Sequence, residues 1–377
     1  MHVEAVELRV IALPMVAPFV AAHGTVSSRT AVLVRILGTE DEGWGECAAL
    51  PEPTYSEEFV DGAYLALQEL LVPRLLATDG TVTATDLGSA FADVIGHPMA
   101  KASIELALLD GQGRRSEISL ARMFAPHSAD PVATVPAGVA IGLLATPEDL
   151  AAEVSTRVAE GYGRIKIKIA PGRDIDFIQA ARDTAGVHIE LSVDANGAYT
   201  LDDAKMLAEL DDFDLAYIEQ PLAADDLLNH AELARRISTR ICLDESLTSA
   251  TVTREALDMG ACSVVCVKAP RYGSWVEAAS VLDHCAGLGI DAWVGGMLDG
   301  GIGRAANIAL AAHPGALLTG DIAATDRFFT EDVCAPFTVS GPSGGGTITV
   351  PTGPGLGISI DAVALSKLTL RSTIIRR

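Results

Sequence analysis

Five short apolar segments in the middle of the chain end in charged residues at nearly constant intervals. These residues are Lys168, Asp194, Glu219, Asp244 and Lys268, so the successive steps are 26, 25, 25 and 24 residues. A unit of one strand, one helix and two loops needs about 25 residues in a compact barrel. The series therefore predicts consecutive strands of a parallel (β/α)8-type barrel.

Three further apolar runs bring the candidate barrel strands to eight. The eight runs read VPAGVAIG, RIKIKI, IELSVDA, LAYIEQP, RICLDES, SVVCVKA, DAWVGGM and ALLTGDI. We assign residues 126–335 to this barrel as the catalytic domain. Beyond it the chain becomes rich in Gly and Pro, and we expect residues 336–377 to return to the N-terminal part of the molecule.

The residues before the barrel have the pattern of a separate α+β unit. Residues 3–11 and 30–37 alternate like strands, with a connecting loop between them. Residues 57–78 and 101–115 carry Leu, Ala and Ile at helical spacing. We therefore predict an α/β chain in which residues 1–125 form an N-terminal capping domain, completed by the C-terminal segment.

Charge and cysteine usage limit the partners. The formal net charge is −23, from 27 basic and 50 acidic residues, and such a chain repels nucleic acid and anionic membranes. The six cysteines form no CxxC pair, and no apolar run reaches about 18 residues. We expect a cytoplasmic protein with reduced thiols that forms a homo-oligomer and binds small molecules and metal cations.

Three of the strand ends carry carboxylates on neighbouring strands. Active sites of parallel barrels lie at the carboxyl ends of the strands, so Asp194, Glu219 and Asp244 should converge there. Converging carboxylates repel one another unless a cation lies among them. Mg²⁺ is the expected occupant, with Mn²⁺ as the alternative. If each carboxylate capped the N-terminus of its own helix, its presence would be explained, but not why all three lie at the same level of the barrel.

The lysines surround this predicted metal site. Lys166 and Lys168 are two residues apart on one strand, so both side chains point into the barrel. Lys268 ends a strand on the other side of the metal site. Crowding and burial should lower the pKa of these amines toward that of a useful base. The arrangement suits abstraction of a proton α to a carboxylate, assisted by a metal ion.

Several segments together resemble one enzyme family along nearly the whole chain. They read PMVAPF, GWGEC, GHPMAKASIELALLD, RIKIKIAPG, SVDANGAYT, YIEQPL, ICLDES, GGMLDGGIGRAAN and VPTGPGLG. These motifs are similar to those of the muconate lactonizing enzyme subgroup of the enolase superfamily. More narrowly, the chain resembles the family of o-succinylbenzoate synthases and N-acylamino acid racemases.

The resemblance implies roles for the lysines and a choice between two reactions. Lys168 would be the acid/base on one face of the substrate, Lys268 its counterpart on the other, and Lys166 would lie near the substrate carboxylate. The implied activity is dehydration of 2-succinyl-6-hydroxy-2,4-cyclohexadiene-1-carboxylate in menaquinone biosynthesis. Racemisation of N-acylamino acids is the alternative, because racemases use both lysines as bases whereas the synthase needs one.

The chain departs from the family in two places. The segment CVKAPRYGS, residues 266–274, differs from the usual Asn-Ile-Lys-Pro-Gly-Arg-Val-Gly-Gly, and Pro270 fixes φ beside Lys268. We expect this change to disfavour two-base racemisation. At positions 299 and 300 this chain has Asp-Gly, where the family frequently has Glu-Thr. The predicted substrate-binding residues are Asn196, Asp299, Gly300 and Arg271.

The loop PFVAAHGT, residues 18–25, is predicted to act as a lid over the substrate. Its residues Val20 to Ala22 are smaller and less polar than those often found in these families. His23 is read as a spectator, because a lone loop histidine is more often solvated than bound to a ligand.

Two hypotheses of other kinds stay open at this point. Gly301, Gly303 and Ala306 follow an apolar strand with Asp321 20 residues after the first glycine, which matches a dinucleotide-binding fingerprint. This pattern would indicate an NAD-dependent dehydrogenase, but it leaves the lysines and carboxylates unexplained. An inactive metal-binding scaffold is the other alternative, since the loop around Lys268 is altered.

Overall fold

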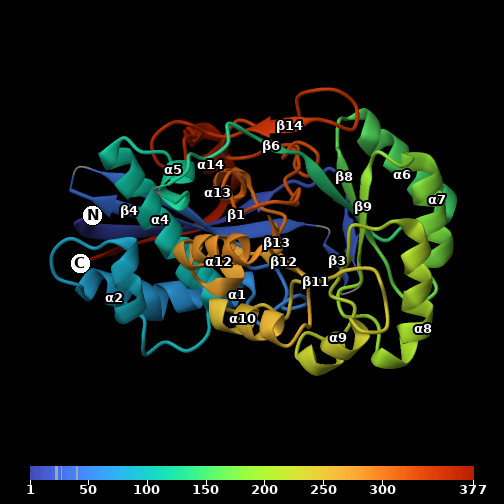
Figure 1. Ribbon diagram of the computed structural model, residues 1–377. Helices are drawn as coiled ribbons and strands as arrows, with labels where there is room; N and C mark the ends of the chain where they lie inside the picture. Colours follow the sequence, from blue (N-terminus) through green and yellow to red (C-terminus); the bar gives the residue numbers. More distant parts are fainter. Residues whose placement is uncertain (22–23, 27, 40, 127) are drawn as a thin grey trace.

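The computed structural model places an antiparallel sheet with its helices beside a curved parallel sheet that is surrounded by helices (Figure 1). It describes residues 1–21, 24–26, 28–39, 41–126 and 128–377. No helix of this described part is long and apolar enough to cross a membrane.

The antiparallel sheet joins the two ends of the chain. Its strands lie in the order β15 (Thr369–Arg376), β1 (Val3–Leu13), β4 (Arg29–Gly38) and β5 (Glu42–Cys47). Strand β15 pairs antiparallel with β1, so the C-terminal segment completes the N-terminal sheet as predicted. The exact domain boundaries stay predictions.

Helices form at both predicted helical stretches, residues 57–78 and 101–115, and further helices accompany them. The bounds are α1 (Val60–Ala66), a π-helical turn (Leu67–Leu71), α2 (Val72–Ala77), a 3₁₀ turn (Ala84–Asp86), α3 (Leu87–Ala90), α4 (Pro98–Ser116), α5 (Leu120–Phe124) and α14 (Ala362–Leu368). Helix α4 packs on β5 so closely that a Cβ added at Gly45 would lie 2.0 Å from the Ser103 carbonyl oxygen. Only glycine fits such a backbone contact.

The connection between β1 and β4 was predicted to be a loop, but it contains a short hairpin of β2 (Phe19–Ala21) and β3 (Gly24–Val26). The predicted lid, residues 18–25, includes β2 and the first two residues of β3. Residues 22 and 23 of the lid lie outside the described residues, so the interpretation of His23 is not tested.

The parallel sheet has seven paired strands in sequential order. They are β7 (Gly138–Ile141), β8 (Arg164–Lys168), β9 (Glu190–Asp194), β10 (Ile218–Glu219), β11 (Ile241–Leu243), β12 (Val264–Val267) and β13 (Asp291–Val294). The intervening helices are α6 (Pro147–Ala159), α7 (Ile175–Ala185), α8 (Ala204–Leu207), α9 (Leu227–Leu233), α10 (Ala250–Asp258), α11 (Ala269–Tyr272), α12 (Trp275–Leu288) and α13 (Gly301–Ala311). Two 3₁₀ segments (Leu201–Asp203 and Ala208–Phe213) flank α8, and β6 (Thr134–Pro136) pairs with β14 (Thr347–Thr349).

The eighth run, ALLTGDI, differs from its prediction. It is not a strand in the structure, and it joins the two edges of the sheet by a few isolated backbone hydrogen bonds. Leu318 N–H donates to the Ala292 carbonyl over 3.1 Å. Asp321 N–H donates to the Val294 carbonyl over 3.0 Å, and Gly138 N–H donates to the Ile322 carbonyl over 3.3 Å. A Cβ added at Gly138 would lie 2.2 Å from the Gly320 carbonyl oxygen. Close packing of two glycine backbones thus closes the barrel in place of a regular ladder.

Buried glutamates of the N-terminal part cap helices of the barrel. Glu105 on α4 accepts hydrogen bonds from Ser274 Oγ over 2.7 Å and from the Trp275 N–H at the start of α12. Glu46 on β5 accepts from the N–H groups of Gly300 and Gly303 over 2.7 and 2.8 Å at the start of α13. The two parts are therefore joined by carboxylates that satisfy otherwise unpaired helix donors.

We expect Glu105→Ala to lower the free energy of unfolding by about 2 kcal/mol, because it leaves buried N–H groups of α12 without an acceptor. Urea denaturation measures the change. Glu105→Gln is the matched control, since it keeps an acceptor oxygen and should lose less stability. An alanine variant as stable as the original chain would show that this carboxylate does not hold the helix.

Candidate active site

The carboxyl ends of the barrel strands bring several of the predicted residues to one cavity. Its lining includes Lys166, Lys168 and Lys268 with Asp194 and Asn196. Strands β8 and β12, which carry or precede the lysines, are separated in the sheet by β9, β10 and β11. Amines therefore face the cavity from two sides of the barrel.

Lys168 is the last residue of β8 and lies in register with Asp194 on β9. Its ammonium donates to Asp194 Oδ2 and to Asn196 Oδ1, both over 2.6 Å. Asn196 adopts a positive φ of 44° and donates its amide to Glu245 Oε1 over 2.7 Å. The Lys168 side chain is thus held by a carboxylate and by an amide with a fixed orientation.

Lys166 lies deeper on the same strand, among carboxylates. Its ammonium donates to Glu219 Oε2 over 2.8 Å and to Asp321 Oδ2 over 2.7 Å. Burial alone would lower the pKa of Lys166, but Asp321, Glu219 and Asp194 raise it well above its usual value. On the far side of Asp321, the Arg164 guanidinium forms a further ion pair with it.

Lys268 follows β12 on the other side of the cavity. Its ammonium donates to Asp244 Oδ2 over 2.6 Å and to the Tyr55 hydroxyl over 2.8 Å, and it lies 4.7 Å from the centre of the Tyr55 ring. Arg271 donates to Asp244 Oδ1 over 3.0 Å. Despite burial, Asp244 and nearby groups raise the pKa of Lys268.

The expectation of lowered lysine pKa values is therefore wrong for Lys166 and Lys268. Crowding by cations and burial can be inferred from the sequence, whereas the carboxylates that contact each ammonium cannot. A carboxylate in contact with a buried ammonium favours its charged form more than burial disfavours it here.

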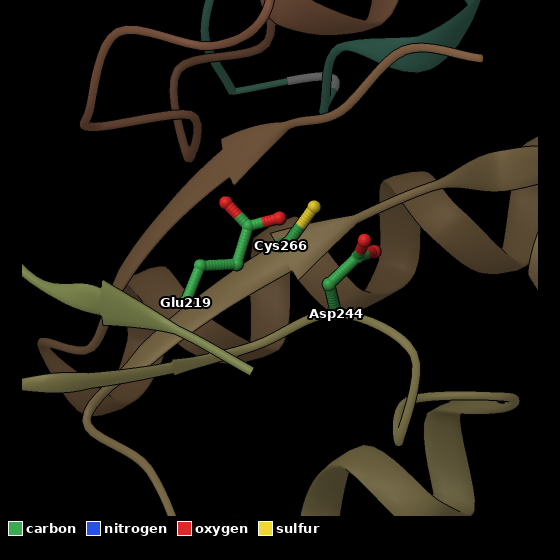
Figure 2. A group of neighbouring side chains, drawn as sticks. All are labelled: Glu219, Asp244 and Cys266. Atoms are coloured by element: carbon green, nitrogen blue, oxygen red, sulfur yellow. The ribbon is translucent and has the colours of Figure 1, made fainter. Parts of the chain in front are cut away.

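The predicted metal ligands form a crowded acidic group. Ligand atoms of Glu219 and Asp244 lie within 4.8 Å of each other and of Cys266 Sγ (Figure 2). Asp194 is in register with Glu219 on the neighbouring strand. Burial raises the pKa of Glu219, and repulsion by Asp194 raises it further. Glu219 Oε1 is buried and has no hydrogen-bond partner among the described residues. An unpaired buried carboxylate oxygen in this setting fits a ligand of a divalent cation.

Two predicted substrate contacts have other partners. Asp299 accepts from the Met297 N–H over 3.0 Å and from Asn307 Nδ2 over 2.8 Å. The Gly300 N–H donates to Glu46, as described above. Asp299 and Gly300 thus form hydrogen bonds within the protein near the start of α13. Of the other two predicted contacts, Asn196 lines the cavity and Arg271 donates a hydrogen bond to Asp244. Direct substrate contact by any of the four stays a prediction.

The same helix start accounts for the dinucleotide-like fingerprint. In that fingerprint a pyrophosphate binds at the helix N-terminus. Here the Glu46 carboxylate takes that place, and Asp321 pairs with Lys166 and Arg164. The glycines serve close packing: a Cβ added at Gly303 would lie 2.9 Å from the Asp299 side chain.

Two residues of the site were missed as site residues from the sequence. Tyr55 comes from the N-terminal part and ends no barrel strand, so no periodic signal marks it. Asp321 ends the eighth apolar run, as Asp194 and Asp244 end theirs, so the strand-end rule could have identified it.

An α+β cap beside a parallel barrel whose strand ends carry lysines and carboxylates defines an enzyme of the enolase superfamily. The model of the mandelate racemase / muconate lactonizing enzyme N-terminal domain matches residues 5–124, and that of the enolase C-terminal domain-like family matches residues 149–364. The chain belongs to this mandelate racemase / muconate lactonizing enzyme family.

Individual relatives are similar over their full lengths. An N-succinylamino acid racemase from Amycolatopsis sp. is 45% identical, with 99% of this chain and 100% of that protein covered. An o-succinylbenzoate synthase from Geobacillus kaustophilus is 38% identical, with 100% and 98% covered. The crystal structure of an enolase superfamily member from Listeria innocua has a TM-score of 0.92 and 36% identity, with 100% and 99% covered.

Proposed function

We propose that the protein is an o-succinylbenzoate synthase, which removes the α-proton of 2-succinyl-6-hydroxy-2,4-cyclohexadiene-1-carboxylate and eliminates water on the way to menaquinone. The proposal rests on one base and one fixed cation facing each other across the cavity. The Lys268 ammonium contacts the Asp244 carboxylate much as Lys168 contacts Asp194, but it also lies over the face of the Tyr55 ring. This additional contact favours a charged, fixed Lys268 side chain.

The three lysines have different roles in the proposed reaction. Lys168 takes the α-proton and then returns it to the departing β-hydroxyl, which leaves as water, so its charge is restored at the end of the cycle. Lys268 stabilises the negative charge that develops on the enolate from the opposite side. Lys166 lies between Glu219 and Asp321 and holds these carboxylates in position.

A divalent cation would be held by Asp194, Glu219 and Asp244. When bound, Mg²⁺ or Mn²⁺ neutralises part of the charge on the substrate carboxylate as it becomes an enediolate. The substrate's carboxylate would lie beside these three residues, with its α-carbon toward Lys168.

Racemisation of N-succinylamino acids is the second candidate. The observation that favours it is the presence of two amines on opposite sides of one cavity, which is what exchange of an α-proton between two faces requires. The 45% identical relative from Amycolatopsis sp. carries the corresponding name. The two activities need the same metal and the same first proton transfer.

A parallel assay of both substrate classes separates the candidates. With Mg²⁺ present, we expect kcat/KM for dehydration of the cyclohexadiene substrate to exceed that for racemisation of N-succinyl amino acids by about tenfold or more, because Lys268 is fixed as a cation. Absorbance of the aromatic product measures the first reaction and polarimetry the second. Faster racemisation would assign the protein to the second candidate.

The homo-oligomeric state, the cytoplasmic location and the absence of nucleic-acid partners stay predictions. Light scattering at several concentrations measures the first of these directly.

A further inference from the structure

A thiol lies at the edge of the proposed metal site. Cys266 on β12 offers its sulfur within 4.8 Å of carboxylate oxygens of Glu219 and Asp244. Figure 2 shows the three side chains extending from neighbouring strands toward a common space. All three residues are buried.

The position of the thiol follows from strand geometry. Residues 264, 266 and 268 alternate onto one side of β12, so Cys266 points into the barrel one step below Lys268. It packs there with Tyr217, Cys242 and Trp293. The glycine that follows the neighbouring strand β13 leaves room for it, since a Cβ added at Gly295 would lie 2.8 Å from Cys266 Sγ.

The ligand atoms of Glu219, Asp244 and Cys266 lie near enough to one another to bind a single metal ion that accepts both sulfur and oxygen ligands. Metal–oxygen bonds of about 2.1 Å and metal–sulfur bonds of about 2.3 Å allow two ligand atoms of one ion to lie at most about 4.4 Å apart. The three ligand atoms lie within 4.8 Å of one another, so small side-chain movements would bring them to one ion. Glu219 Oε1, which lacks a hydrogen-bond partner among the described residues, is a second sign of a missing ligand. Thiolates prefer ions such as Zn²⁺ and Cd²⁺ over Mg²⁺.

We propose that the site also binds thiophilic divalent cations, with Cys266 Sγ, Glu219 and Asp244 as ligands. This inference rests on the metal site of the proposed function. As the metal–sulfur bond forms, the thiol proton leaves to solvent, and no oxidation or reduction takes place. Asp194 keeps its contact with Lys168, so the soft ion competes with Mg²⁺ for two of its three proposed ligands.

Cadmium titration of the metal-stripped, reduced full-length chain tests the inference without substrate. We expect a sulfur-to-cadmium charge-transfer band in the ultraviolet, release of a proton, and competition by excess Mg²⁺. Cys266→Ser should remove the band and weaken Cd²⁺ binding on the order of 10- to 100-fold. No band in the original chain, or an unchanged band in the variant, would overturn the inference.

Cys242→Ser is the matched control, because Cys242 is equally buried in the same cluster and precedes Asp244 by two residues. It should keep the band, and loss of the band there would reassign the ligand and overturn the role of Cys266. Circular dichroism checks folding, and Cys266→Ala replaces Cys266→Ser if the latter unfolds. Mg²⁺-dependent turnover without a cadmium band would contradict this inference alone. A cadmium band without turnover would contradict the proposed function alone.

Discussion

Replacing Lys168 by alanine is expected to lower the turnover of the cyclohexadiene substrate by about 10⁴-fold, because the variant loses the group that takes and returns the proton. The ammonium is held between Asp194 and Asn196, so its removal deletes the proposed base without disturbing a backbone contact. Stopped-flow absorbance with saturating Mg²⁺ measures the effect.

Lys205→Ala controls for the loss of a lysine as such, since Lys205 is exposed on α8. The Lys168 variant should keep its circular dichroism spectrum and bind Mg²⁺ in calorimetry. Retained dehydration in a folded, metal-binding Lys168→Ala protein would refute the role assigned to this lysine.

Replacing Glu219 by glutamine is expected to raise the Mg²⁺ concentration needed for half-maximal activity by about 100-fold. The glutamine keeps the size of the side chain but removes the charge of a carboxylate whose Oε1 has no other partner among the described residues. It also weakens the contact with Lys166, which lies 2.8 Å from Oε2. Activity measured across a Mg²⁺ titration reports the shift.

Glu209→Gln provides the comparison for the loss of one negative charge, because Glu209 is exposed on the barrel surface. Its metal requirement should not change. If Glu219→Gln had the same metal requirement as the original chain, Glu219 would not be a metal ligand.

The strand-end series predicted the barrel and much of the cavity because parallel strands bring their carboxyl ends to one edge. Lys168, Asp194 and Lys268 could be placed together from spacing alone. The eighth strand could not be predicted correctly, since Gly138 and Gly320 close the barrel through a backbone contact that apolar content does not reveal.

Contacts between distant segments also lay beyond the sequence pattern. Tyr55 contacts Lys268, which lies 213 positions later in the chain, and Glu46 contacts Gly300, which lies 254 positions later. Whether the pKa values of Lys166 and Lys268 are raised or lowered depends on the same kind of contact between distant segments. Burial and charge crowding could be inferred from a barrel interior, but the oxygen that each ammonium approaches is set by packing.

Exchange of the α-proton of N-succinyl amino acids in deuterium oxide tests whether this site abstracts an α-proton. It reports proton abstraction at this site whichever overall reaction dominates, and mass spectrometry detects the deuterium. We expect exchange in the Mg²⁺-loaded protein and its loss after chelation or in Lys168→Ala. Metal binding without exchange, together with no dehydration of the cyclohexadiene substrate, would identify an inactive metal-binding scaffold and contradict the proposed enzymatic function.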